Sequence, residues 1–185
     1  MNSIEDIIPK TGRIGRFAKI IKKEVPKELF LTLLKDSEKY SSFSPSRKAE
    51  WWKETVIKME NELGAEKTKE IMTICGSKCC GLGHRKTVRK KFEESSSIEE
   101  FLKKISARDV TYKLIDKNTI LAEYQRCFCG LVNATKTAFP NMTYCQCSVE
   151  FNRQYFSSAF NKPAKVKLIK TVITGNDSCQ FAIHF

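Results

Sequence analysis

The stretch AKVKLIKTVITGNDSCQFAIHF, residues 164–185, decides the fold class of this chain. Apolar residues alternate with lysines in its first part, and Cys179, Phe181 and Ile183 alternate in its last part. A period of two is typical of strands that bury one face of a sheet. The intervening GND is a favourable turn sequence. The stretch therefore predicts two antiparallel strands, with the Cys179 thiol packed in the core as a small hydrophobe.

Two segments upstream complete the C-terminal part. The segment VTYKLIDKNTILAEYQ, residues 110–125, has two β-rich runs around residues 116–118, which predicts a hairpin. The segment SVEFNRQYFSSAF, residues 148–160, places aromatic residues four apart and predicts an amphipathic helix at about 149–160. Ser148 is the expected N-cap of that helix.

Helical periodicity dominates the first hundred residues. Pro26 is placed to open one helix, Gly64 to end another and Ser97 to cap a third. The chain is thus predicted to be an α+β fold. Its helix-rich N-terminal part, residues 1–108, is expected to pack with a Cys-rich part, residues 109–185, that holds an antiparallel sheet and helices. A chain of 185 residues can bury such a core in one compact domain.

The net charge of +12 makes an anionic partner one interpretation. Basic residues concentrate in HRKTVRKK, residues 84–91, within an expected helix at about 84–94, and in KPAKVKLIK, residues 162–170. The alternative is a solvated helix face and an edge strand that lysines protect from aggregation. Because no helix-turn-helix, zinc-finger or aromatic RNA-binding signature accompanies the charge, we do not expect nucleic acid as the partner.

The N-terminus and the cysteine usage predict a cytoplasmic protein. The first residues, MNSIEDIIPK, have neither the basic region nor the apolar segment of a secretory signal. No apolar run approaches the roughly 20 residues that span a bilayer. Cytoplasmic thiols stay reduced, so clustered cysteines there indicate metal binding or reactivity more often than disulfides.

Two Cys-x-Cys pairs are the main functional signal among the eight cysteines: CFCG, residues 127–130, and YCQCS, residues 144–148. Alternate Cα atoms of an extended chain are about 6.6–6.8 Å apart, so chelation of one zinc ion by the first pair requires a turn, which Gly130 allows. Sulfur-only sites favour zinc or an iron–sulfur cluster. The spacing matches neither a ferredoxin pattern nor a standard zinc ribbon, and we rank zinc first and an iron–sulfur cluster second. The predicted ligands are Cys127, Cys129, Cys145 and Cys147, with Cys79 and Cys80 as alternates.

Cys145 and Cys147 have a second interpretation, as nucleophiles. They lie just ahead of the predicted helix, whose N-terminus carries a partial positive charge that stabilises a thiolate. His84 is then a candidate base, although a solvated helix cap is the simpler interpretation of a histidine beside basic residues. His184 alternates away from the apolar stripe of the last strand, and Cys75 is expected to be the last core position of a helix.

The segment 127–185 resembles the end of a group of bacterial small-ligand domains. The shared pattern is a Cys-led helix, a strand similar to kPVkVel, and then sGd-x-x-C-x-F-x-I. The group includes the 4-vinyl-reductase domains, which are related in fold to TRAPP vesicle-tethering subunits, and proteins similar to L-2-amino-thiazoline-4-carboxylic acid hydrolase. The sequence departs from the pattern at Val149, Lys170 and Thr171. The matching residues are Cys147, Phe160, Pro163, Val166, Leu168, Gly175, Asp177, Cys179, Phe181 and Ile183.

The resemblance implies an α+β fold that encloses a small-molecule pocket, and it implies that cysteines bind a metal. The RCFCG and YCQCS segments are most similar to Cys-rich members near the hydrolase. The first hypothesis is therefore a cytoplasmic Cys-rich module that binds a metal ion and a small ligand. In this hypothesis, the N-terminal helices form a homodimer or contact another partner.

The alternative hypothesis is a thiol-dependent hydrolase of a small cyclic amide or thiazoline. One thiol would attack the substrate, a histidine would shuttle the proton and an arginine would hold a carboxylate. The residues assigned to these roles are, in that order, Cys145 or Cys147, His84 or His184, and Arg153 or Arg126.

Overall fold

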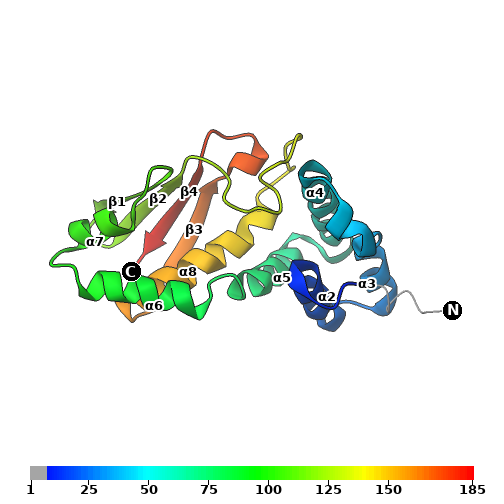
Figure 1. Cartoon of the computed structure of the whole chain (residues 1–185), viewed down its shortest axis with the longest axis horizontal. Coiled ribbons are helices and arrows are strands. Elements are labelled where there is room, and N and C mark those ends of the chain that lie inside the picture. Colours follow the sequence, from blue (N-terminus) through cyan, green and yellow to red (C-terminus); the bar gives the residue numbers. More distant parts are fainter. Residues whose placement is uncertain (1–7) are drawn as a thin grey trace.

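A four-stranded antiparallel sheet, covered by helices on one face, forms one half of the molecule, and further helices form the other half (Figure 1). The structure, a computed structural model, describes residues 8–185. The expected α+β class is confirmed. The elements are α2 (Gly12–Glu24), α3 (Lys27–Leu33), η1 (Ser37–Ser42), α4 (Pro45–Leu63), α5 (Ala65–Ser77), α6 (Leu82–Glu93), α7 (Ile98–Ile105), β1 (Val110–Asp116), β2 (Thr119–Tyr124), η2 (Thr143–Cys145), α8 (Gln146–Phe160), β3 (Lys165–Lys170), η3 (Val172–Thr174) and β4 (Cys179–His184).

The strand order of the sheet is β1-β2-β4-β3, and every neighbouring pair is antiparallel. The predicted alternation of β4 is confirmed, because Cys179, Phe181 and Ile183 are buried. Between β3 and β4 the chain makes the short helical turn η3 and then reverses at Gly175, whose φ of 91° lies in the left-handed region. Glycine occupies that region without a Cβ penalty.

The helix ends follow local rules of capping. The Ser44 hydroxyl accepts a hydrogen bond from the amide of Arg47, and the Ser97 hydroxyl accepts one from the amide of Glu100. These bonds satisfy amide groups that have no partner inside the helix. Gly64, at φ 81°, separates α4 from α5 as predicted. No helix in the described part of the chain is both long and apolar enough to cross a membrane.

Helix α8 begins earlier than the sequence pattern predicts. It starts at Gln146, with Cys145 at the N-cap position, so the predicted N-cap Ser148 lies inside the first turn. The preceding turn η2 leads directly into the helix, because the Cys145 amide donates to the Met142 carbonyl at 2.9 Å. The apolar periodicity used for the prediction begins at Val149, after this polar first turn.

Two groups of buried apolar residues stabilise the two halves. The helical cluster combines side chains of α2, α3 and α4 with Ile71 and Met72 of α5, and the sheet cluster combines side chains of α6, α7, α8 and the strands. The members of the helical cluster include Phe17, Ile21, Leu33, Tyr40, Trp51, Trp52, Met59 and Ile71. The members of the sheet cluster include Val88, Phe101, Ile120, Phe156, Phe181 and Ile183.

The segment between β2 and α8 belongs to the helical cluster although it follows the sheet in the sequence. It buries Val132, Phe139 and Tyr144 there. Polar contacts hold the same segment on α4, where the Glu60 carboxylate accepts hydrogen bonds from Asn141 at 2.8 Å and Thr143 at 2.6 Å. Conversely, α6 and α7 pack in the sheet cluster. The division at residue 108 stays a prediction, and the buried clusters do not follow it.

Candidate functional site

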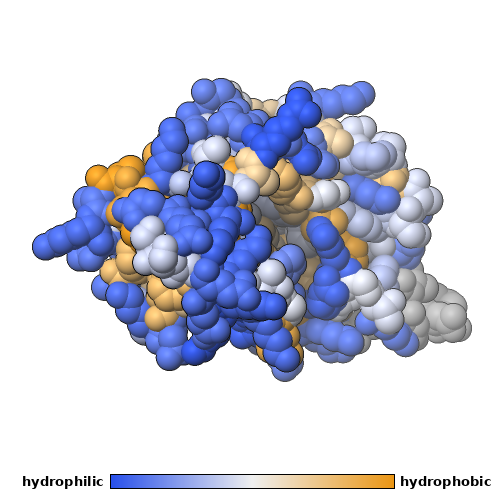
Figure 2. All heavy atoms as spheres, turned by 60° about the vertical axis from the view of Figure 1, so that its left-hand side comes forward, coloured by the Kyte–Doolittle hydropathy of each residue, from blue (hydrophilic) through white to orange (hydrophobic). Residues whose placement is uncertain are grey.

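A cavity of about 520 Å³ lies between the two halves of the molecule. Its walls come from α2, the turn between α5 and α6, strands β1, β2 and β4, the segment after β2, and the start of α8. Figure 2 shows one face of the molecule, on which hydrophilic side chains surround a hollow with hydrophobic residues at its edge. The cavity thus depends on both clusters.

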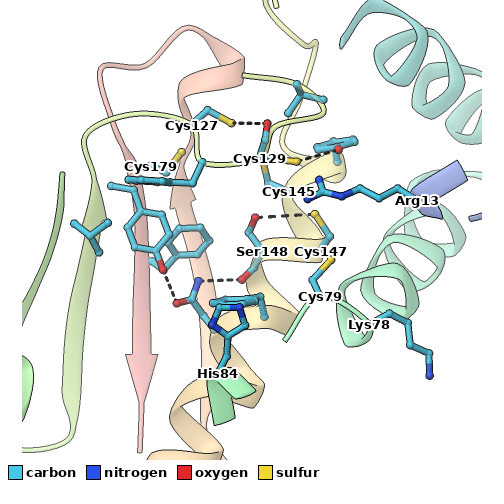
Figure 3. A pocket seen from close by; sticks show the side chains of 18 of the residues that line it. Arg13, Lys78, Cys79, His84, Cys127, Cys129, Cys145, Cys147, Ser148 and Cys179 are labelled. Atoms are coloured by element: carbon cyan, nitrogen blue, oxygen red, sulfur yellow. Dashed lines mark hydrogen bonds between the residues drawn. The ribbon is translucent and has the colours of Figure 1, made fainter. Parts of the chain in front are cut away.

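Six of the eight cysteines line this cavity, and all eight are free thiols. The sequence positions of these six span a hundred residues, and the fold brings them to one place (Figure 3). Cys75 instead packs, half-buried, against the helical cluster, and the alternate ligand Cys80 is buried away from the cavity walls. The lining cysteines are Cys79, Cys127, Cys129, Cys145, Cys147 and Cys179.

The early start of α8 separates the second Cys-x-Cys pair. Residues two apart in a helix do not face each other. Besides burial, the thiols that raise the pKa of Cys147 are Cys129, Cys145 and Cys79, and those that raise the pKa of Cys145 are Cys179, Cys127 and Cys129. The leading thiol neighbour thus differs, Cys129 for Cys147 and Cys179 for Cys145, while Cys129 acts on both.

We call Cys79, Cys129 and Cys147 the α5-side thiols and Cys127, Cys145 and Cys179 the sheet-side thiols. The two sets adjoin, because Cys129 also acts on Cys127 and Cys145. In Figure 3 the sulfur of Cys147 is directed toward the Ser148 hydroxyl, 4.0 Å away, and the sulfur of Cys79 points toward the Cys147 side chain. The two helices come very close here: a Cβ on Gly76 of α5 would lie 2.5 Å from the carbonyl oxygen of Cys147. Glycine at position 76 is thus what allows the first turn of α8 to contact α5.

The four predicted zinc ligands are divided between these two sets. Cys129 and Cys147 belong to the α5-side thiols, and Cys127 and Cys145 belong to the sheet-side thiols. Within residues 8–185, no three cysteine, histidine, aspartate or glutamate side chains are arranged to hold a metal ion. The donor type suits zinc or an iron–sulfur cluster, but the described arrangement does not fit either group, so both stay predictions.

Burial opposes ionisation of the cavity thiols. It raises the pKa of Cys127 to about 11, and it also raises the pKa values of Cys145 and Cys147. Desolvation disfavours the charged form of an acid. The sequence predicts ionised sulfur at the start of α8, whereas the buried environment favours neutral thiols.

Two of the cavity thiols have polar neighbours. The sulfur of Cys129 lies 3.3 Å from the hydroxyl oxygen of Tyr144, and the sulfur of Cys179 accepts a hydrogen bond from the Val172 amide at 3.3 Å. Buried polar groups of this kind are normally paired. These contacts orient the side chains within the wall of the cavity.

The two histidines lie outside the thiol sets. His84 is an exposed residue at the edge of the cavity, and its ring packs edge-on against Phe151 with centroids 5.6 Å apart. His184 is exposed at the end of β4, where its Nδ1 lies 3.0 Å from the Thr119 hydroxyl. In the described residues, neither imidazole has a hydrogen bond to a cysteine.

The arginines expected to hold a carboxylate already have acidic partners. Arg153 pairs with Glu150 at 2.6 Å, and Arg126 pairs with Asp109 at 2.8 Å. Neither arginine lines the cavity. The arginines that do line it are Arg13 and Arg16 of α2, which the sequence analysis missed. Their signal in the sequence is weak, because a spacing of three on an amphipathic helix also describes an ordinary solvated face.

A polar network lies in the cavity wall formed by β1, β2 and α8. The Tyr124 hydroxyl donates to the side-chain carbonyl of Asn152 at 2.7 Å, and the Asn152 amide donates to the Ser148 carbonyl at 2.9 Å. The hydroxyl of Tyr112 lies 3.4 Å from that of Tyr124. This wall is otherwise apolar and includes Phe181 of β4.

Comparison with known families places the chain in a group without an assigned activity. The family model described as a family of unknown function, DUF6144, matches residues 17–185. The chain belongs to this family. The matched segment contains all six cysteines of the cavity, while Arg13 and Arg16 precede it. No curated protein matches the sequence.

Proposed function

We propose that this DUF6144 protein binds a small, largely apolar molecule in the cavity between its two clusters. The observation that carries the proposal is a single cavity lined by six free thiols and several aromatic side chains. Its volume of about 520 Å³ falls within the roughly 300–1,000 Å³ of ligand pockets in proteins. The few polar groups in its walls would orient the ligand, as the network around Asn152 illustrates.

The thiols support binding more than catalysis. A nucleophilic cysteine is normally activated by a lowered pKa or by an adjacent base. Burial instead raises the pKa of Cys145 and of Cys147, and His84 packs on Phe151. The thiol-dependent hydrolase is therefore the less supported of the two hypotheses. Neutral thiols are soft and polarizable, and they suit an apolar ligand.

The proposal does not require a metal ion. Zinc, held by thiols, remains a prediction of the sequence, as do the cytoplasmic location and a homodimer through the N-terminal helices. Nucleic acid is not part of the proposal, because the cavity is concave, small and largely apolar in its walls.

The test is a fluorescence titration with N-phenyl-1-naphthylamine, a neutral apolar probe whose emission rises in apolar surroundings. Val110 of β1 lines the cavity and its neighbour Thr111 does not, since alternate residues of a strand face opposite sides. Val110→Trp should fill part of the cavity and weaken binding at least about tenfold, which is about 1.4 kcal/mol. Thr111→Trp is the matched control and should bind as the wild type does.

Saturable binding with one site per chain, lost in Val110→Trp and kept in Thr111→Trp, supports the proposal. Absence of binding to the wild type, or equal binding to both variants, contradicts it. Circular dichroism of both variants verifies that the fold is unchanged.

A further inference from the structure

We propose that the ligand is an organic anion, with an apolar body inside the cavity and a single acidic group bound by Arg13 and Arg16 of α2. The acidic group is a carboxylate, or a sulfonate or phosphate of similar charge and hydrogen-bonding capacity. This inference rests on the proposed function and narrows it to a chemical class.

The charges around the cavity all have one sign. Among its lining residues, the ionisable side chains other than thiols and tyrosines are Arg13, Arg16, Lys78 and His84, and none is an aspartate or glutamate. Basic side chains at the mouth of a cleft with apolar walls attract anions and repel cations. The described residues thus favour a negatively charged ligand.

Arg13 and Arg16 lack acidic partners within residues 8–185, as do Arg85 and Arg108, but of these four arginines only Arg13 and Arg16 line the cavity. Within residues 8–185, no carboxylate forms an ion pair or a hydrogen bond with either of them. Their spacing of three places them on the same side of α2. Four other arginines each pair with a carboxylate: Arg47 with Glu54, Arg89 with Glu93, Arg126 with Asp109 and Arg153 with Glu150.

The direction of the side chains distinguishes the bases at the cavity. In Figure 3, Arg13 reaches from α2 toward Cys147, whereas Lys78 points away from the sulfurs. The positive charges of Arg13 and Arg16 also act on Cys79, where they lower the pKa against the larger, raising effect of burial. Both arginines line the cavity and Arg13 reaches toward the α5-side thiols, so we leave Lys78, which points away, out of the proposed site.

The start of α8 adds a second positive contribution on the same side of the cavity. The helix dipole places partial positive charge at this end of α8, although the turn η2 already pairs the Gln146 amide with the Thr143 carbonyl. No side chain caps this terminus, and Cys147 and Ser148 of its first turn line the cavity. An acidic group near Arg13 would therefore also face the N-terminus of α8, a usual position for bound anions.

The rest of the cavity explains why the ligand body is apolar. The opposite wall consists largely of aromatic side chains, among them Tyr112, Tyr124 and Phe181, whose hydroxyls are already hydrogen-bonded where present. A charge placed against this wall would lose its hydration without compensation. The acidic group therefore belongs at α2, and the uncharged part of the ligand belongs at the sheet.

The test compares two probes that share one ring system. The anionic 8-anilinonaphthalene-1-sulfonate differs from the neutral N-phenyl-1-naphthylamine by one sulfonate. Each is titrated into the wild-type chain and into the variants Arg13→Gln, Arg16→Gln and Lys19→Gln. Lys19 is exposed on α2 and does not line the cavity, so its variant controls for the loss of one charge.

We expect the anionic probe to bind the wild type at least about tenfold more tightly than the neutral probe. Arg13→Gln and Arg16→Gln should each lower the affinity for the anionic probe by about tenfold and leave the affinity for the neutral probe unchanged. Lys19→Gln should change neither. Val110→Trp should lower the affinity for both probes. That result would show that the anionic probe binds in the cavity and not on the basic surface.

Equal affinity of the two probes, or arginine variants that leave the anionic probe unaffected, would overturn this inference while the proposed function stands. Anionic binding that persists in Val110→Trp would also overturn it, because that probe would then be held on the surface. Failure of both probes to bind the wild type would overturn the proposed function as well. Unfolding midpoints of all variants confirm that the fold is retained.

Discussion

The helical cluster and the sheet cluster reach the same degree of burial in different ways. The sheet cluster draws its buried residues from two stretches of the chain, 88–122 and 156–183, and its last strand shows simple alternation. The helical cluster needs side chains from a distant segment, namely Val132, Phe139 and Tyr144. Its aromatic centre, where Phe17 and Trp52 pack with ring centroids 4.8 Å apart, is closed by that segment.

This difference shows why the thiols gather where they do. The segment that closes the helical cluster starts at the sheet and ends at α8, so it carries Cys127, Cys129 and Cys145 to the junction of the two halves. Neither cluster alone has a cavity with these walls. The candidate site thus depends on how the two clusters are joined.

The largest expected effect comes from removing an aromatic side chain from either cluster. Phe17→Ala in the helical cluster and Phe156→Ala in the sheet cluster should each lower the free energy of unfolding by about 3–5 kcal/mol, because both rings are at most 2% exposed. Urea unfolding should be followed by circular dichroism and by the fluorescence of Trp51 and Trp52, which both lie in the helical cluster.

Since the clusters share the contact of α5 with α8, we expect both signals to change together, even in Phe156→Ala. Separate transitions would show that the two halves unfold independently and would contradict the expected coupling between them. Ile169→Ala, which removes a side chain 44% exposed on β3, is the control. It should change the free energy of unfolding by no more than about 0.5 kcal/mol.

A smaller effect is expected at the helix crossing that joins the clusters. Gly76→Ala should destabilise the protein by about 1–3 kcal/mol, since the added Cβ would overlap the backbone of Cys147. The substitution should also weaken the binding of N-phenyl-1-naphthylamine, because the first turn of α8 must move. Gly83→Ala in α6 is the matched control, with open space around the added methyl group. Equal stability of the two variants in urea would contradict the close contact.

The smallest effect concerns pH. Burial raises the pKa of Cys75 from 9.0 to about 12. Above pH 9 the unfolded chain loses this proton while the folded chain keeps it, so the stability falls as pH rises through the interval from about 9 to about 12. The loss from this group should be on the order of 1 kcal/mol at pH 10.

Cys75→Ala removes this group without changing a cavity residue. The variant should therefore lose less stability than the wild type between pH 8 and pH 10, as measured by urea unfolding at each pH. An identical pH dependence of the two proteins would show that Cys75 is accessible to water in the folded state.

The sequence by itself determined the elements that local rules describe. The alternation of Cys179, Phe181 and Ile183 predicts β4, and Gly64 and Ser97 predict helix boundaries, because strand periodicity and capping depend on residues a few positions apart. The same reasoning identified the cysteines as the main functional signal and gave the α+β class. These are properties that a short segment carries wherever it lies in the fold.

The tertiary structure alone decided which side chains meet. Helix α8 begins at Gln146, where η2 leads into it, and Gly76 allows its first turn to pack on α5. The same packing brings Cys79 and Arg13 to the cavity from distant parts of the chain. Spacing in a sequence cannot predict such contacts, since they depend on packing between elements, and burial then sets the protonation of the thiols.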